Sequence, residues 1–403
     1  MIMAIKGSRR ASVTSVKRVV SPTHMNDINI RAVTTKQDRK AFVDFAWVAY
    51  KDDPAWVPPL KDEVHGLLDP KKNPWFGHGR AALFLAEREG RVVGRISAQV
   101  DDLVQTHMEA GLGQWGMFEA LDGETAAALI AHAESWLRTE GMTKALGPIS
   151  ISIWDEPGLL IDGFDQPPMV MMAHHLPTYR AWIEGAGYTK AKDLYTYQLD
   201  IRIDMVPVID RLIKAGEKNP RIRIRQVDKS NFDKEAAIIM ALLNDAWSDN
   251  WGYVPLTEAE IAYAGKKLKP IIYEDLVRIA EVDGEPAAFM ITIPDVNEMI
   301  RDLNGDLFPF GWAKLLWRLR KPRTTRVRVP LMGVAKKYQG GRLAGQLAFM
   351  LIEYIRRACV TKYGVHYGEF GWVLEDNQGM MSIAQLPGAE INHTYRIYQK
   401  TLG

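Results

Sequence analysis

The sequence predicts an α+β protein made of two copies of one unit, each a mixed, mostly antiparallel sheet flanked by helices. Three observations support this prediction. Short runs rich in β-branched residues alternate with longer runs whose apolar residues have helical spacing. Glycines stand at hairpin positions between strand-like runs, as at Gly90 and Gly284. The two halves also repeat the same elements in the same order.

Four segments of the first half match four segments of the second half. The pairs are INIRAV with IRIRQV, AWVAYKDDPAWVPPL with AWSDNWGYVPL, FLAEREGRVVGRISAQVDD with RIAEVDGEPAAFMITIPDV, and GAGYTKAKDLYTYQL with LPGAEINHTYRIYQK. One match would be chance, whereas four in one order indicate a duplication. The expected domains are residues 27–205 and 206–403, after a basic disordered tail at residues 1–26.

Each unit is expected to run strand, one or two helices, hairpin, strand, helix, strand, helix and terminal strand. In the second unit RVRVPLMGV, residues 326–334, is short and rich in β-branched residues, which predicts a strand. Apolar residues with helical spacing follow and predict a buried helix face: Leu343, Leu347, Met350, Leu351 and Tyr354. VHYGEFGWVL predicts the next strand, and DNQGMMSIAQL a short helix that ends near Pro387 and Gly388.

Composition excludes several classes of protein. Hydrophobic residues make up 47% and charged residues 25% of 403 residues, which is typical of a globular chain. The net charge of +2 gives no general field for a polyanion, so no nucleic-acid partner is expected. No run of about 18 apolar residues is present, and the single cysteine, Cys359, suits a reducing compartment. A cytoplasmic location is therefore expected. The histidine and cysteine spacings match no common metal motif, so no metal is expected.

The stretch GVAKKYQGGRLAGQL, residues 333–347, has the pattern of a phosphate-binding loop. It follows a strand-like run, contains two adjacent glycines and opens a helix. A helix N-terminus offers free N–H groups and a positive dipole end, and glycines allow an anion to approach the backbone. From Leu307 to Ile352 there are ten basic residues and no acid. This pattern favours a phosphorylated ligand over an ordinary turn.

Here the sequence resembles the GNAT acyltransferase superfamily, whose pyrophosphate loop reads Gln/Arg-x-x-Gly-x-Gly/Ala. The corresponding residues are Gln339, Gly340, Gly341, Arg342, Leu343 and Ala344. The first and last match, whereas Arg342 stands in place of the central glycine. Asn377 and Gly388 fit the family's later helix, but Ala384 occupies the place of the tyrosine that usually acts as general acid. That departure puts the ordinary acid step in doubt.

The resemblance implies a tandem GNAT-like protein with its acyl-CoA site in the second half. In the first half the matching stretch GMFEALDGETAAALI contains no such loop. Runs such as DPAWVPPLKDE, NPWFGHGRA and GPISISIWDEPGLL are similar to a bacterial group of GNAT-like proteins that includes bacterial ceramide synthases. Those enzymes transfer a fatty acyl chain from a thioester to the amine of a long-chain sphingoid base. Members of the group need not share one acceptor.

The implied reaction, attack of a neutral amine on an acyl-CoA thioester, requires a proton acceptor and a donor to the thioester oxygen. Glu375 and Asp376 are the first candidates for the base, and Asp155 and Glu156 the second. The alternative role of Asp155 and Glu156 is acidic capping of a helix. Backbone N–H groups of the strand near the loop are expected to bind the thioester oxygen: Leu331, Met332, Gly333 and Val334.

Two further segments are candidates for substrate contacts. Trp154, His174 and His175 could line an apolar pocket, although a structural role for the histidines is the stronger alternative. FPFGWAKLLWRLRKP, Phe308–Pro322, mixes aromatic and basic residues. It suits either a helix at the inner face of the membrane or an amphipathic insertion packed on the domain. The function expected is N-acylation of a lipid amine; a small-amine N-acetyltransferase and a non-catalytic acyl-CoA- or lipid-binding protein are the alternatives. The oligomeric state stays open.

Overall fold

The computed structural model describes residues 28–403, so the basic tail expected at residues 1–26 lies outside the described residues. The first half contains β1 (Asn29–Ala32), α1 (Lys36–Ala49), α2 (Lys61–Leu67), β2 (Gly79–Arg88), β3 (Arg91–Asp101), α3 (Asp102–His107), β4 (Leu112–Ala120), α4 (Gly123–Thr139), β5 (Lys144–Gly147), β6 (Ile149–Ser150), β7 (Glu156–Pro157), β8 (Leu159–Asp162), α5 (Thr178–Gly185) and β9 (Thr189–Asp200).

The second half repeats this order. It contains α6 (Pro207–Glu217), β10 (Ile222–Gln226), α7 (Phe232–Trp247), α8 (Glu258–Leu268), β11 (Val277–Val282), β12 (Glu285–Pro294), α9 (Val296–Ile300), α10 (Gly311–Arg320), β13 (Arg326–Val334), α11 (Arg342–Ala358), β14 (Tyr367–Leu374), α12 (Gln378–Gln385) and β15 (Glu390–Thr401). The main strands and helices of the two halves correspond one to one, which confirms the predicted fold class.

One mixed sheet joins the two halves within residues 28–403. Its strand order is β1-β2-β3-β4-β5-β15-β9-β14-β13-β12-β11-β10, and β8 pairs with the free part of β15. Only the β4–β5 and β13–β14 pairs are parallel among the described strands. The order is symmetric about its centre, because β1 to β5 on one side correspond to β10 to β14 on the other. This symmetry is the structural expression of the repeat in the sequence.

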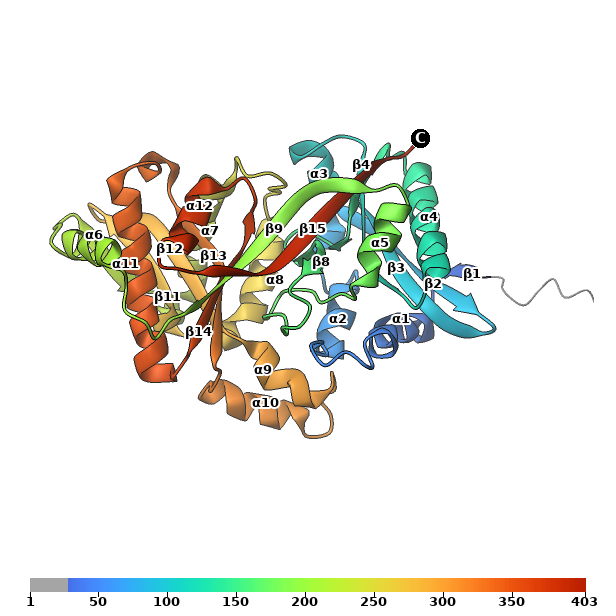
Figure 1. Cartoon of the computed structure of the whole chain (residues 1–403), viewed down its shortest axis with the longest axis horizontal. Helices are drawn as coiled ribbons and strands as arrows, with labels where there is room; N and C mark the ends of the chain where they lie inside the picture. Colours follow the sequence, from blue (N-terminus) through green and yellow to red (C-terminus); the bar gives the residue numbers. More distant parts are fainter. Residues whose placement is uncertain (1–27) are drawn as a thin grey trace, which may run out of the picture.

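The terminal strands of the two halves are exchanged. β15, the last strand of the second half, pairs with β5 of the first half, and β9 pairs with β14 of the second. The two exchanged strands pair with each other and run side by side across the middle of the molecule (green and red in Figure 1). The boundary expected between residues 205 and 206 falls in the loop after β9, but the sheet does not divide there. Two separate domains therefore remain a proposal.

The two hairpins predicted from glycines have the same turn. Glu89 and Gly90 have φ angles of 52° and 75°, and Asp283 and Gly284 have 55° and 84°. Two successive positive φ angles characterise the type I′ turn, which matches the twist of an antiparallel pair. These turns confirm that β2–β3 and β11–β12 are equivalent hairpins.

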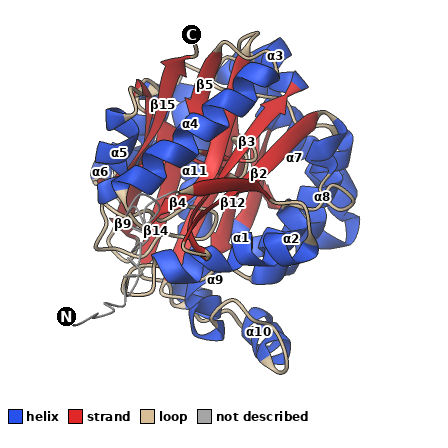
Figure 2. Ribbon diagram, turned by 90° about the vertical axis from the view of Figure 1, so that its right-hand side faces the viewer, coloured by secondary structure: helices blue, strands red, loops and turns tan. Residues whose placement is uncertain are grey.

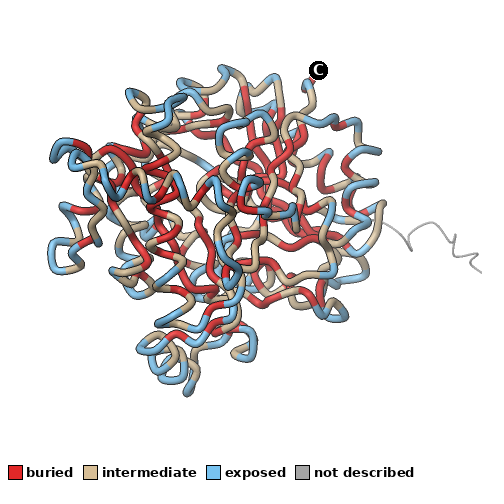
Figure 3. The backbone as a smooth tube through the Cα atoms, turned by 60° about the vertical axis from the view of Figure 1, so that its left-hand side comes forward, coloured by how far each residue is buried: buried red, intermediate tan, exposed pale blue. Residues whose placement is uncertain are grey.

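Helices cover both faces of the sheet in the second half. α11 packs on one face around Met332 and Leu347, whereas α7 and α8 pack on the other around Leu331 and Leu243. Successive residues of β13 therefore point to opposite faces, as the period of a strand requires. Figure 3 shows buried residues running through the interior of the molecule and exposed residues at its outer turns. The α9–α10 segment between β12 and β13 projects from this body at the bottom of Figure 2.

Candidate active site

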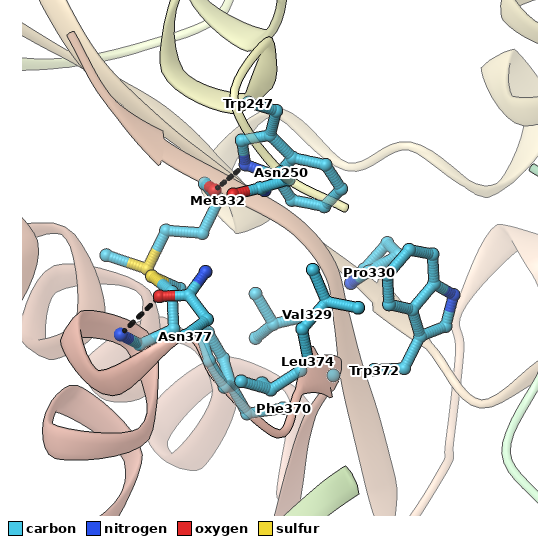
Figure 4. Close-up of a pocket in the computed structure, with 12 residues that line it drawn as sticks. Trp247, Asn250, Val329, Pro330, Met332, Phe370, Trp372, Leu374 and Asn377 are labelled. Carbon is cyan, nitrogen blue, oxygen red and sulfur yellow. Dashed lines mark hydrogen bonds between the residues drawn. The ribbon is translucent and has the colours of Figure 1, made fainter. Parts of the chain in front are cut away.

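The parallel strands β13 and β14 separate over their second halves. They pair as far as Val329 and Phe370, although β13 continues to Val334 and β14 to Leu374. The pairing of β14 with β9 also shifts register from Phe370 onward. The gap between them holds a small cavity of about 30 Å³, and Figure 4 shows the residues around it. It is lined by Trp247, Asn250, Val329, Pro330, Met332, Phe370, Gly371, Trp372, Val373, Leu374, Asn377 and Met380. We call this gap the strand cleft.

Met332 directs its backbone polar groups into the strand cleft. Its carbonyl accepts a hydrogen bond from Trp247 Nε1 at 3.0 Å (Figure 4). Further along the same strand pair, Ala335 N–H donates to Ala287 O at 2.8 Å, so that alternate residues of β13 bond to β12. By this alternation the N–H and C=O of Met332 point away from β12. The Met332 N–H is thus a donor placed in the cleft.

Asn377 lies at the other wall of the strand cleft. Its Oδ1 accepts the N–H of Met380 at 3.1 Å and caps α12 (Figure 4). This bond orients the side chain, so the amide nitrogen remains available to a ligand. The helix begins at the place predicted from the sequence.

The loop before α11 leaves the helix N-terminus open. Gln339 Nε2 donates to the carbonyl of Val334 at 2.8 Å and closes the loop on β13. Gly340 has φ 74°, a conformation that favours glycine. Gly341 is the N-cap residue, and no side chain caps the helix or places an acid in its first turn. Ala344 N–H donates to the carbonyl of Gly341 at 3.1 Å. The N–H groups that precede it at the start of α11 have no partner in the helix and are free to bind an anion.

The equivalent helix of the first half, α4, is closed to anions. Asp122 Oδ1 accepts the N–H of Thr125 at 2.8 Å, and Glu124 lies in the first turn. Arg88 pairs with Asp122 at 2.8 Å. A carboxylate therefore already occupies the place where a phosphate would bind.

The gap between β4 and the end of β5 is also filled in the first half. A Cβ on Gly116 would lie 2.1 Å from the carbonyl oxygen of Ile149, so the backbone of β6 fits directly against β4. Ser150 Oγ accepts the N–H of Met117 at 3.3 Å. An open cleft beside an open helix terminus thus exists in the second half alone among the described residues.

The acid-free basic run noted in the sequence is largely neutralised by acids from other segments. Lys336 pairs with Asp249 at 2.6 Å, and Lys337 with Glu285 at 3.0 Å. Arg342 is exposed at the first turn of α11. The fold thus brings acids from other segments near the loop, and they offset part of the charge that the run carries along the sequence.

Comparison with known proteins decides the family. The bacterial ceramide synthase of Caulobacter vibrioides is 43% identical over 379 residues, which cover 93% of this chain and 98% of that protein. Protein YghO of Escherichia coli is 41% identical over 376 residues, 93% of this chain and 95% of that protein. The chain belongs to the group of bacterial proteins that includes the bacterial ceramide synthase.

A solved structure agrees with the fold of this chain. A tandem GNAT protein from the clavulanic acid biosynthesis pathway superposes with a TM-score of 0.55 at 15% identity, covering 94% of this chain and 99% of that one. No protein-family model matches the chain. The predicted tandem GNAT fold is thereby confirmed.

The first pair of candidate bases is engaged by lysines. Glu375 and Asp376 follow β14, where Lys190 and Lys192 of the exchanged strand β9 reach them. Asp193 N–H also donates to Glu375 Oε1 at 3.1 Å. The hydrogen bond from Lys192, at 2.7 Å, lowers the pKa of Asp376. A carboxylate stabilised in this way is a weaker proton acceptor, and the catalytic role of both residues stays a prediction.

The second pair lies in an environment better suited to a base. Asp155, at the end of the loop after β6, and Glu156, the first residue of β7, are half-buried. Burial raises the pKa of Asp155 to about 6, and Ser152 Oγ donates to Asp155 at 2.8 Å. Burial, followed by the negative charge of Asp155, raises the pKa of Glu156 to about 7. Groups that titrate near neutral pH are effective proton acceptors.

Trp154 connects this loop with the strand cleft. Its indole stacks on that of Trp247 with ring centroids 6.2 Å apart and planes at 14°. Trp154 Nε1 donates to the carbonyl of Val254 at 2.9 Å. Trp247 in turn lies 6.2 Å from Trp372 across the cleft. The loop with Asp155 is therefore held beside the cleft by three indoles.

The two candidate histidines have partners within the first half. His174 Nε2 lies 2.8 Å from Asp53 Oδ2, and burial lowers the pKa of His174. His175 Nδ1 accepts the N–H of Leu160 at 3.1 Å, and burial lowers its pKa to about 3. Neither residue lines the strand cleft. These contacts are consistent with a structural role for both histidines. A role of His174 and His175 in substrate binding stays a prediction.

Sequence reasoning missed a histidine close to Trp154. His78 Nδ1 lies 2.9 Å from Asp101 Oδ1, and His78 Nε2 lies 3.2 Å from Glu260 Oε2 of α8. The three side chains line a small cavity together with Trp154 and Ser152. His78 stands in NPWFGHGRA, a run that indicated the resemblance to known proteins but no role for the histidine. No spacing in the sequence links residues so far apart in the chain.

A tyrosine of the other half packs beside Ala384, the residue at the place of the family tyrosine. Ala384 of α12 is buried and packs with Tyr197 of the exchanged strand β9. The Tyr197 hydroxyl is buried and has no hydrogen-bond partner among the described residues. Among residues 28–403, no group of three or more His, Cys, Asp or Glu side chains is arranged to hold a metal ion.

Proposed function

We propose that this protein transfers a fatty acyl group from acyl-CoA to the primary amine of a long-chain sphingoid base, as in bacterial ceramide synthesis. The observation that carries the proposal is the 43% identity to the bacterial ceramide synthase over nearly the full length of both chains. The alternatives are a small-amine N-acetyltransferase and a non-catalytic acyl-CoA- or lipid-binding protein.

The proposed place of CoA is the strand cleft and the loop at its end. Its diphosphate binds the backbone N–H groups at the start of α11, where Gly340 and Gly341 allow close approach. Arg342 adds a positive charge, and Asn377 contacts the cofactor from the opposite wall. The remaining cofactor contacts proposed are Leu331, Met332, Gly333, Val334, Gln339, Leu343 and Ala344. The open terminus of α11, in contrast to capped α4, supports this placement.

The proposed chemistry is direct attack of the amine nitrogen on the thioester carbon. The Met332 N–H donates to the carbonyl oxygen as negative charge develops there. Asp155 or Glu156 accepts the proton from the amine, either directly or through a water molecule. The C–S bond then breaks and CoA leaves as a thiolate, which takes a proton from water because Ala384 has none to give. Glu375 and Asp376 are the second candidates for the base, because lysines already pair with them.

Product analysis tests this function. The purified protein is incubated with decanoyl-CoA and a long-chain sphingoid base, and with acetyl-CoA and small soluble amines, and the products are identified by mass spectrometry. We expect an N-acylated sphingoid base, formed at least tenfold faster than any acetylated small amine. Efficient acetylation of small amines without reaction of the long-chain base would contradict the ceramide proposal. Binding of acyl-CoA without any product would support the non-catalytic alternative.

The proposed lipid acceptor is collected from a membrane surface by α10 and the turn before it. Phe308, Phe310 and Trp317 are 77%, 78% and 73% exposed, and Trp312 and Leu316 are also exposed. On its other side the insertion packs Leu303, Leu307 and Leu315 against the body. The segment is thus a packed insertion that presents aromatic side chains outward, an arrangement suited to the boundary of a bilayer. No helix in residues 28–403 has the length and apolar character needed to cross a bilayer.

Replacing Trp312, Leu316 and Trp317 together by serine should weaken binding to anionic phosphatidylglycerol vesicles at least tenfold, because these side chains would no longer enter the bilayer boundary. Co-sedimentation measures the binding, and calorimetry should show CoA affinity within twofold of the wild type. Leu386→Ser serves as the control, since Leu386 is also exposed, at 43%, but is the C-cap residue of α12. Equal vesicle binding by the triple variant would refute the membrane contact.

A further inference from the structure

An apolar cavity of about 120 Å³ lies between α7, α8 and the sheet of the second half. Its wall is formed by aliphatic side chains such as Ile239, Leu243, Ile261, Leu268 and Ile291. We call it the α7–α8 cavity.

The few charged residues at the α7–α8 cavity are already satisfied within the chain. Glu235 pairs with Arg225 at 2.9 Å, and Lys229 Nζ donates to the carbonyl of Ile272 at 2.8 Å. Asp228 Oδ1 accepts the N–H of Ser230 at 2.9 Å. No polar group in this wall needs a ligand partner, so the ligand that fits the cavity is a hydrocarbon.

The α7–α8 cavity adjoins the strand cleft. Leu331 lines the cavity, and the next residue of β13, Met332, lines the cleft. Trp154 also lines the cavity and stacks on Trp247, which lines the cleft. One strand and one pair of stacked indoles therefore separate the apolar space from the donor proposed for the thioester oxygen.

We propose that the α7–α8 cavity holds the hydrocarbon chain of the acyl thioester, an inference that rests on the proposed function. α11 and the proposed CoA loop belong to one face of the sheet, whereas α7 and α8 cover the other. The acyl chain begins at the carbonyl carbon bound at Met332 and continues past Leu331 to the far face. Each methylene group buried there raises affinity about fourfold. The cavity thus selects long acyl donors over acetyl-CoA.

Substituting Ala236 in the cavity wall by tryptophan tests the assignment. We expect wild-type protein to bind decanoyl-CoA at least 20-fold more tightly than CoA, as measured by calorimetry. Ala236→Trp should remove most of this difference and leave the affinity for CoA within twofold, because the indole fills the space of the chain. Ala237→Trp is the matched control: Ala237 is the next residue of α7 but is exposed and lies outside the cavity wall.

Several outcomes would overturn the inference. One is a wild type that binds decanoyl-CoA no more tightly than CoA, and another is an Ala236→Trp variant that keeps the full difference. If Ala236→Trp does not fold, Ala264→Trp on the facing helix α8 gives the same test, with exposed Ala262→Trp as its control. A rise in KM for the sphingoid base, with decanoyl-CoA affinity unchanged, would assign the cavity to the acceptor and overturn the proposal.

The binding measurement separates this inference from the proposed function, because it needs no acceptor. If decanoyl-CoA binding depends on Ala236 but the sphingoid base is not acylated, the acyl-chain site stands and the choice of acceptor fails. If the sphingoid base is acylated with equal efficiency by the wild type and Ala236→Trp, at all donor chain lengths, the acceptor stands and the acyl-chain site fails.

Discussion

Replacing Gly341 by aspartate should abolish CoA binding without harming the fold. Gly341 is the N-cap residue of α11, in an extended conformation that any residue adopts, and a Cβ there meets only the Tyr338 carbonyl at 3.8 Å. An aspartate would accept the free N–H groups, as Asp122 does in α4, and its charge would repel the diphosphate. We expect the Kd for CoA to rise at least 100-fold, about 2.7 kcal/mol.

Thermal unfolding provides the control for this variant. An aspartate cap stabilises a helix by about a few tenths of a kcal/mol more than a glycine cap does. The midpoint of unfolding should therefore be unchanged or slightly higher. Asp122→Asn, made at the equivalent cap of the first half, should leave CoA affinity unaltered because α4 is not the proposed site. A Gly341→Asp protein that binds CoA normally would mean that the diphosphate lies elsewhere.

The double variant Asp155→Asn/Glu156→Gln should lower kcat/KM by roughly 100-fold or more, the contribution of a positioned general base. In the wild type, kcat/KM should fall as pH drops below the range from about 6 to about 7, where burial places the pKa values of the two carboxyls. The variant should lack this limb of the profile. Glu375→Gln and Asp376→Asn should each change kcat/KM less than fivefold, because lysines already engage these side chains.

Stability supplies a second readout for Asp155. The pKa of about 6 in the folded state exceeds the ordinary value of 3.8, so between these values the folded protein holds a proton that the unfolded chain has lost. Stability due to this group therefore falls as pH rises from 4 to 6. At pH 8, Asp155→Asn should be more stable by about 1 kcal/mol, less than the full shift implies because the side chain is partly solvated.

The activity measurements can contradict the choice of base. Unaltered kcat/KM in the double variant, or a loss of about 100-fold in Glu375→Gln, would assign the base to Glu375 and Asp376.

The two hairpin turns and the helix after Gly341 were predicted correctly, because both depend on residues close together in the sequence. Gly90 and Gly284 mark equivalent hairpins because a type I′ turn requires positive φ angles at specific positions. The helix after Gly341 was recognised because its apolar face repeats with the period of a helix. The duplication was visible for the same reason, since each repeated signal spans only a few neighbouring residues.

The exchange of terminal strands was decided by the tertiary structure alone. The alternation of residues in β9 and β15 sets which side chain faces the core, but it does not specify which neighbouring strand accepts the backbone hydrogen bonds. Because β9 lies beside β14, Lys190 pairs with Glu375 and Lys192 pairs with Asp376. Both carboxylates are thereby stabilised and accept a proton less readily. That contact joins residues more than 180 positions apart.

The sequence by itself determined the family, the duplicated α+β plan and the glycine loop at the start of α11. The tertiary structure decided which charges remain free, because Asp249 and Glu285 reach the loop lysines from other elements. It also decided where the apolar space lies, since the α7–α8 cavity depends on how two helices rest on the sheet. Ion pairing and cavity shape depend on distances across the fold, whereas composition and spacing record only order along the chain.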